Sequence, residues 1–130
     1  MVVFFAVILY PQIKIMTVVR RLAYTLAQLC REWKFPEAQS TLFHEEAVNI
    51  EPDGRITSGL PAIMAKEQLF LDNIVERHLL EISEPIVADD YFALQLLMDV
   101  TIVNIGRRTR NELCVYHVKD GKIIREQFFY

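Results

Sequence analysis

The sequence ELCVYHVKDGKIIREQFFY, residues 112–130, contains the clearest structural pattern of the chain. Apolar and polar side chains alternate on both sides of the dipeptide Asp120-Gly121, and a period of two is typical of β-strands. A two-residue turn between antiparallel strands needs positive φ at both central residues, which aspartate and glycine tolerate. The stretch therefore predicts a β-hairpin whose strands are Arg107–Val118 and Lys122–Tyr130.

Two more strands are predicted immediately upstream of this hairpin. Alternating segments run from Glu76 to Ala88 and from Tyr91 to Asn104. The dipeptides Asp89-Asp90 and Ile105-Gly106 separate the segments and have the composition of turns. Together with the hairpin, these segments predict an antiparallel meander of four strands.

The first half of the chain has helical spacing instead. Apolar residues recur every three or four positions from Thr17 to Phe35, which predicts a first helix. Pro36–Phe43 suits a second helix, because proline is favoured in a first turn. A short strand is predicted at Ala47–Glu51, and a third helix from Ser58-Gly59-Leu60-Pro61 to about Val75. This order predicts an α+β fold with helices on one face of the sheet.

The N-terminus carries an unbroken apolar run, Val2–Leu9, followed by Tyr10-Pro11. The run is much shorter than the roughly 20 residues of a membrane-spanning helix. It has no preceding basic residue and no small-residue cleavage site, which disfavours a signal peptide. We expect an ordered extra strand or arm; the alternative is a natural start at Met16. Residues 1–15 are therefore treated as an extension and residues 16–130 as one domain.

Composition restricts the partners that we expect. Hydrophobic residues make up 52% of the 130 residues, enough for one real core. The net charge of −3 gives no basic footprint, so no nucleic-acid partner is expected. Cys30 and Cys114 are too few for a disulfide framework and fit a reducing, cytoplasmic location. No metal site, cofactor or membrane association is expected, because neither ligand spacing nor a glycine-rich phosphate loop is present.

Four segments resemble the SnoaL-like group of the nuclear-transport-factor-two-like superfamily. They are LCREWKF (residues 29–35), GLPAIMAK (59–66), ELCVYHVKDGKI (112–123) and REQFFY (125–130). The resemblance covers Leu22 to Tyr130 and extends to ketosteroid isomerase, polyketide cyclases and dehydratases. It implies a cone of three helices on a curved, mostly antiparallel sheet that encloses a pocket, and a homodimer. Because this superfold hosts many unrelated functions, the resemblance is specific for fold alone.

The resemblance also indicates which strand faces line the pocket. Side chains on a strand alternate between two faces, so residues two apart lie together. Matching the strands to ketosteroid isomerase implies that one face of each of the last two strands points into the pocket. The same matching places Glu51, which immediately precedes Pro52, at the position of that enzyme's general base. The inward residues that we single out are Glu112, Cys114, Tyr116, Glu126, Phe128 and Tyr130.

Three carboxylates, Glu51, Glu112 and Glu126, are thus expected at an otherwise apolar cavity. Desolvation and mutual repulsion both raise the pKa of a carboxyl group, and a pKa near neutrality suits proton transfer. We expect Glu112 to be the polar centre of the pocket, with Glu51 as its partner. The alternatives are that Glu126 pairs with an arginine, that Glu112 only joins strands through Arg110 or Arg125, or that these groups reach solvent at the pocket mouth.

The chain departs from the isomerase at its oxyanion donors. In that enzyme a tyrosine and a protonated aspartate donate to the substrate oxygen. The resemblance places Leu26 at the tyrosine position, and Tyr24, two residues away, is expected to point elsewhere. Cys114 occupies the aspartate position, and a thiol is a weak donor. Steroid isomerisation is therefore not expected; Tyr116 could donate instead or could simply pack.

Two further polar residues have open roles. His78 stands where the third helix gives way to a strand, on the same face as Leu80 and Ile82. Its ring could reach the pocket as an acid, a base or a ligand-orienting donor, or it could be a structural histidine. Asp99 lies within an apolar strand, and the sequence does not decide which face it occupies.

The sequence thus leaves three hypotheses. The first is an enzyme that uses pocket carboxylates, with Glu51, Glu112 and His78 as candidate catalytic residues, for proton transfer on a small apolar carbonyl compound. The second is a pocket protein that binds a small ligand without catalysis. The third is a homodimeric interaction domain, which the apolar run Phe92–Val103 favours because exposed apolar sheet surface usually marks an interface.

Overall fold

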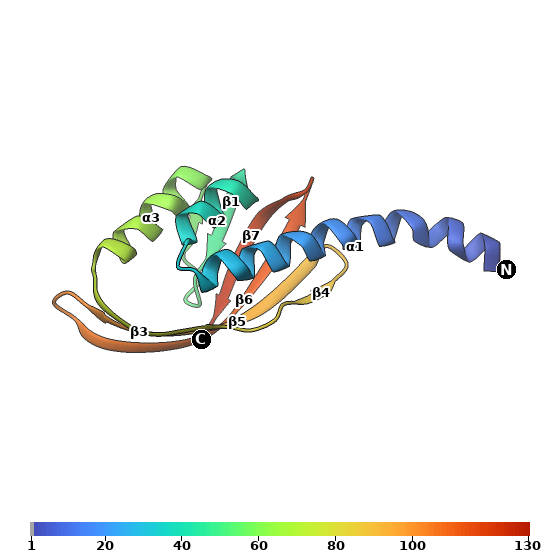
Figure 1. The fold of residues 1–130 in the computed structure, drawn as a ribbon. Helices are drawn as coiled ribbons and strands as arrows, with labels where there is room; N and C mark the ends of the chain where they lie inside the picture. Colours follow the sequence, from blue (N-terminus) through green and yellow to red (C-terminus); the bar gives the residue numbers. More distant parts are fainter. Residues whose placement is uncertain (1) are drawn as a thin grey trace.

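The computed structural model describes the backbone of residues 2–130 and the side chains of residues 17–130. Three helices lie on one face of a single curved sheet (Figure 1). The helices are α1 (Val2–Arg31), α2 (Phe35–Leu42) and α3 (Leu60–Asp72). The strands are β1 (Phe43–Ile50), β2 (Ile56–Ser58), β3 (Ile74–Ile82), β4 (Ile86–Ala88), β5 (Tyr91–Ile102), β6 (Gly106–Lys119) and β7 (Lys122–Phe129).

The sheet has seven strands in the order β2-β1-β7-β6-β5-β3, and β4 pairs with β5. Every pair is antiparallel except β1 with β7, which run parallel. The predicted α+β class with a mostly antiparallel sheet is confirmed. The parallel pair brings the middle of the sequence beside its end, and this juxtaposition builds one wall of the pocket described below.

The predicted meander is present, with one interruption. Asp120 and Gly121 have φ of 54° and 74°, as the mirror-image turn between β6 and β7 requires. The segment predicted as one strand from Glu76 to Ala88 is divided into β3 and β4. Pro85 lies between the two parts, where a residue without an N–H cannot continue the ladder of hydrogen bonds.

The core lies between the helices and the concave face of the sheet. Helix α1 buries one stripe at helical spacing and packs against β5, where Phe92 is 1% exposed. The ring of Phe92 stacks on Tyr116 of β6 with their centroids 4.7 Å apart. The buried stripe on α1 consists of Val19, Ala23, Leu26, Ala27 and Cys30.

The structure contradicts the strand alternative for the N-terminal run, and it contains one short strand that was not predicted. The backbone of Val2–Leu9 is the beginning of α1, not a strand; β-branched residues favour strands only weakly, and a continuing helix overrides them. How this run packs involves side chains outside the described residues. Strand β2 was not predicted, because a three-residue strand is too short to show a period. It pairs with β1 across the turn that contains Pro52 and Gly54.

The outer face of the sheet carries no helix and is partly apolar (Figure 1). Leu113 of β6 and Phe129 of β7 are paired neighbours and are 46% and 49% exposed. Leu79 of β3 is exposed on the same sheet. Among residues 17–130, no helix is both long enough and apolar enough to cross a membrane.

Candidate functional site

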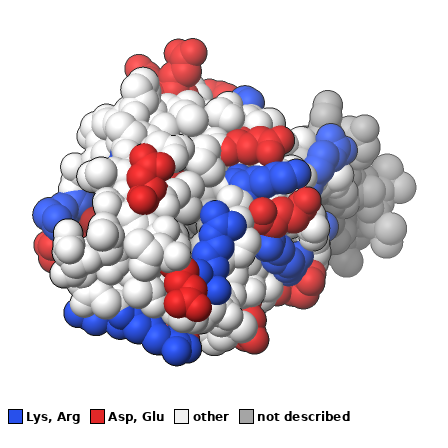
Figure 2. Space-filling model, turned by 60° about the vertical axis from the view of Figure 1, so that its left-hand side comes forward, with Lys and Arg blue, Asp and Glu red and all other residues white. Residues whose placement is uncertain are grey.

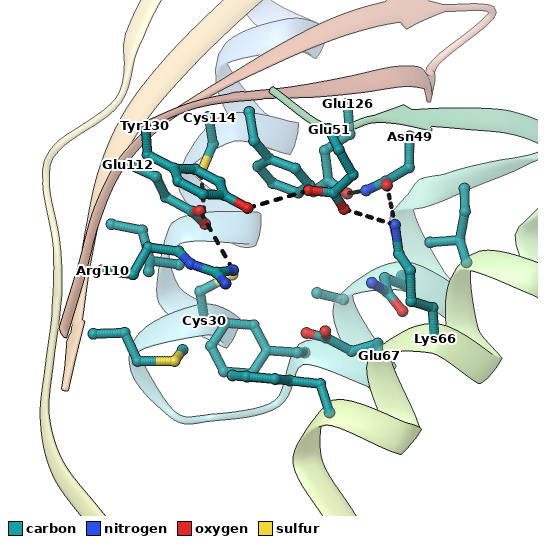
Figure 3. A pocket seen from close by; sticks show the side chains of 18 of the residues that line it. Cys30, Asn49, Glu51, Lys66, Glu67, Arg110, Glu112, Cys114, Glu126 and Tyr130 are labelled. Carbon is teal, nitrogen blue, oxygen red and sulfur yellow. Dashed lines mark hydrogen bonds and ion pairs between the residues drawn. The ribbon is translucent and has the colours of Figure 1, made fainter. Parts of the chain in front are cut away.

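A cavity of about 300 Å³ lies between the concave face of the sheet and the helices. Figure 3 shows polar side chains entering it from β1, β6, β7 and α3. Most of the remaining wall is hydrophobic, which favours a ligand with an apolar body. The apolar lining residues are Leu26, Phe35, Ala38, Phe43, Ile63, Phe70, Leu94, Leu96, Met98, Val100, Ile102 and Phe128.

The alternation on β6 and β7 places the expected side chains at this cavity. Leu113, between two of the inward residues, is exposed on the other face of the sheet. Leu26 of α1 also lines the cavity, whereas Tyr24 is 41% exposed and is not a lining residue. The sequence-predicted residues that line the cavity are Glu51, Glu112, Cys114, Tyr116, Glu126, Phe128 and Tyr130.

Glu112 has an unsatisfied oxygen inside the cavity. The residue is 7% exposed, and its Oε2 is buried without a hydrogen-bond partner. Its Oε1 accepts from Sγ of Cys114 at 3.6 Å, and the guanidinium of Arg110 lies 3.9 Å from Oε2. Burial raises the pKa of Glu112, while Arg110 and the thiol of Cys114 oppose that rise. The group is therefore a basic carboxylate with a free acceptor position.

Glu51 lines the same cavity as Glu112 but does not bond to it. Its Oε1 accepts from Nζ of Lys66 at 2.9 Å, and its Oε2 accepts from the hydroxyl of Tyr130 at 3.4 Å. The Tyr130 ring also lies 4.6 Å from the guanidinium of Arg110. Glu51 is thus held at the pocket mouth by an ammonium and a phenol, and it acts on Glu112 only through its charge, which raises the pKa of Glu112.

A hydrogen-bond network connects the floor of the cavity to this ion pair. Nδ2 of Asn49 donates to Oε1 of Glu126 at 2.8 Å, and Nζ of Lys66 donates to Oδ1 of Asn49. Tyr116 bonds Glu126 as well. Burial raises the pKa of Glu126 to about 7, although the bonds from Asn49 and Tyr116 lower it. Among residues 17–130, no arginine pairs with Glu126; the amide of Asn49 and the phenol of Tyr116 lie beside it instead.

Glu67 of α3 is a site residue that the sequence analysis missed. Its side chain points into the cavity from the helix, opposite the strands (Figure 3). It forms no hydrogen bond or ion pair with any residue from 17 to 130. Burial, followed by the charge of Glu112, raises its pKa to about 7. Ile63 and Phe70 lie four residues before and three after it, a helical spacing that could have revealed it.

Gln39 of α2 adds a second unsatisfied buried oxygen. It is 8% exposed, and its Oε1 has no hydrogen-bond partner at the cavity wall. Buried polar atoms are nearly always hydrogen-bonded, so each exception requires an explanation. Among residues 17–130, the cavity thus contains two buried oxygens without a hydrogen-bond donor, on Gln39 and Glu112, to which a ligand could donate.

His78, a candidate catalytic residue, does not line the cavity; of the two roles left open for it, the position fits the structural one. Its Nε2 lies 2.7 Å from Oγ1 of Thr101, and Nδ1 lies 3.9 Å from Glu76. The pairing of β3 and β5 is irregular between Arg77 and Leu79, which changes the simple alternation. Asp99 is likewise not a lining residue; Arg107 donates to its carboxylate at 2.8 Å.

The two cysteines are buried thiols at the cavity wall. Burial raises the pKa of both Cys30 and Cys114 far above its ordinary value, so neither is a thiolate nucleophile. Within residues 17–130, no group of His, Cys, Asp and Glu side chains is arranged to hold a metal ion. On the face drawn in Figure 2, acidic and basic side chains are interspersed and neither sign dominates.

Comparisons with known proteins give the family. A SnoaL-like polyketide cyclase by name, from Mesorhizobium loti, is 30% identical with a TM-score of 0.78, covering 85% of this chain and 97% of that one. A second protein with the name SnoaL-like polyketide cyclase, from Jannaschia sp., is 11% identical with a TM-score of 0.71. The match covers 88% of this chain and 86% of that one. A protein of ketosteroid isomerase-like fold from Catenulispora acidiphila, solved with trimethylamine, is 18% identical with a TM-score of 0.61, covering 73% and 74%.

A search of curated proteins gave no match. The model of the SnoaL-like domain matches residues 16–130. The two structures below 25% identity support the fold alone, whereas the family model covers most of the chain. The chain therefore belongs to the SnoaL-like domain family.

Proposed function

We propose that this protein binds a small apolar carbonyl compound and catalyses proton transfer on it, as an isomerase, a cyclase or a dehydratase does. The observation that carries the proposal is the buried Oε2 of Glu112, which accepts no hydrogen bond from residues 17–130, in a largely apolar cavity. A carboxylate with a raised pKa is a stronger base than one in water, and desolvation prevents water from competing for it. Proton transfer by carboxyl groups requires no cofactor.

The proposed base accepts a proton from a carbon next to the carbonyl group. The apolar walls would hold the carbon skeleton, and Oε2 would lie within reach of the α-hydrogen. Glu51 is a weaker candidate for this role, because Lys66 and Tyr130 already occupy its two oxygens. Its proposed role is to hold the mouth of the cavity and to set its charge.

Hydrogen–deuterium exchange tests this proposal. The probe is β-tetralone, a two-ring ketone with acidic α-hydrogens, incubated in heavy water and followed by loss of its α-proton NMR signals. We expect exchange to rise with protein concentration and to saturate with ketone. Binding of the ketone, seen as line broadening, without exchange above the buffer rate would instead establish a non-catalytic binding pocket.

We also propose a homodimer that is formed through the outer face of the sheet. Leu113, Phe129 and Leu79 are exposed there, where solvation of apolar surface is unfavourable. Leu113→Glu should raise the dimer dissociation constant at least about a hundredfold, because a charge without a partner would be buried. Sedimentation at micromolar concentration measures this. Leu69→Glu, on the exposed side of α3, is the control; a monomeric wild-type mass would contradict the proposal.

A further inference from the structure

Two carboxyl groups face this cavity from opposite walls. Glu112 extends from β6 and Glu67 from α3, with the open part of the cavity between them (Figure 3). Oε2 of Glu112 accepts no hydrogen bond, and Glu67 forms none with residues 17–130. A ligand held between the walls would therefore meet one free carboxyl group on each side.

The surroundings of the two groups are unequal. Glu112 has the guanidinium of Arg110 at 3.9 Å and a thiol donor from Cys114, both of which favour its ionised form. Glu67 has no donor, and only the more distant charges of Lys66 and Arg110 oppose its burial. Glu112 therefore ionises first, and its charge then makes ionisation of Glu67 harder. In the pH range between these two ionisations, Glu112 is a carboxylate and Glu67 is a carboxylic acid.

We propose that Glu67 is a catalytic residue, the general acid that works with Glu112 as the general base on a substrate bound between α3 and β6. This assignment rests on the proposed function of the site. A pair of carboxyl groups kept in different protonation states is the arrangement that permits simultaneous acid and base catalysis. Protonated Glu67 would also donate a hydrogen bond to the substrate oxygen, which Leu26 and Cys114, at the positions of the isomerase's two donors, do not provide.

The proposed step is an enolisation. The carboxylate of Glu112 removes an α-hydrogen as a proton, and the electron pair of the broken C–H bond forms the C=C bond of the enol. The π electrons of the C=O bond move to oxygen, which takes the proton from the carboxylic acid of Glu67. Glu112 ends protonated and Glu67 ends ionised, so charge and hydrogen balance. For isotope exchange, the proton on Glu112 is replaced by a deuteron from the solvent, which Glu112 returns to the same carbon while the enol hydroxyl returns its proton to Glu67. Delivery to a different carbon gives isomerisation.

The pH profile of β-tetralone exchange tests the role of Glu67. The wild-type profile should be bell-shaped, with an alkaline limb near the pKa of Glu67, about 7. Glu67→Gln keeps a hydrogen-bond donor but cannot release a proton, so exchange at about pH 6 should fall at least tenfold and the alkaline limb should vanish. Glu46→Gln, at an exposed position on β1, should leave rate and profile unchanged.

Other groups near Glu67 must be separated from it. The charge of Glu67 raises the pKa of Glu126 and of Cys30. The charges of Lys66 and Arg110 lower the pKa of Glu67. Glu126→Gln should keep the alkaline limb, because Glu126 is not the proposed acid. A limb that disappears in Glu126→Gln and persists in Glu67→Gln would overturn the assignment. A uniform loss of rate in Glu67→Gln with an intact limb would assign it a structural role.

Carbon-13 NMR of labelled glutamate provides a readout that does not depend on activity. Glu112→Gln should lower the pKa of Glu67, because it removes the opposing negative charge. An unchanged titration of Glu67 would show that the two groups do not act as a pair. If wild-type protein does not exchange the ketone but this coupling is present, the proposed function fails while the paired carboxyls stand. If exchange needs Glu112 and not Glu67, only the inference about Glu67 fails.

Discussion

Glu112→Gln is expected to lower the protein-catalysed exchange of β-tetralone by about a hundredfold to ten-thousandfold, the usual contribution of a positioned base. Glutamine has nearly the shape of glutamate, and its oxygen can still accept the hydrogen bond from Cys114. It cannot accept a proton from carbon. The fold should survive the change, because removing a buried carboxylate with one unsatisfied oxygen relieves a desolvation penalty.

The loss of exchange should occur in kcat and leave binding of the ketone nearly intact. Line broadening of the ketone signals by the variant measures binding, and circular dichroism checks folding. Glu46→Gln removes one negative charge from an exposed position and should exchange the ketone at the wild-type rate. If Glu112→Gln retained that rate, the base would have to be another group and the proposed mechanism would be wrong.

Glu126→Gln is expected to make the protein more stable in mildly alkaline solution. The pKa of Glu126 is raised from 4.5 to about 7 in the folded state. Folding therefore binds a proton between these values, and stability falls as pH rises from about 4.5 to about 7. The wild-type protein should therefore lose roughly 2 to 3 kcal/mol of unfolding free energy between about pH 5 and about pH 8 through this group, and Glu126→Gln should not show this loss.

Urea unfolding at the two pH values measures this difference at a fixed protein concentration. The glutamine oxygen can still accept from Asn49, so the variant should keep that bond. Glu81→Gln, on the exposed part of β3, should show the wild-type pH dependence. A variant that loses equal stability at both pH values would mean that Glu126 is ionised in the folded protein and acts through its charge.

The last two strands were the most informative part of the sequence. Strong alternation around Asp120-Gly121 defines both the turn and the register, so Glu112, Tyr116 and Glu126 could be placed together. That this shared face points into the pocket was implied only by the family resemblance, because alternation along a strand does not show which face of the sheet is covered by helices.

Helix α3 was the least informative part, for a physical reason. Its pocket-facing side combines Ile63 and Phe70 with the charged residues Lys66 and Glu67, so an apolar stripe does not stand out. Lys66 pairs with Glu51 because of how α3 packs against β1. The spacing of residues along the chain does not predict such packing. His78 was misplaced because an irregular pairing near it alters the alternation on which the inference rested.

The position of β7 between β1 and β6 affects how the protein is made. Strand β7 follows all the other strands in sequence and joins the two parts of the sheet. Until it is inserted, β1 has only the short β2 beside it. Asn49 and Glu126, which are 77 residues apart, can meet only after that insertion. Such distant contacts form late, since a long loop must close first. During synthesis, the cavity floor can therefore form only after β7 has left the ribosome, and the pocket stays open until then.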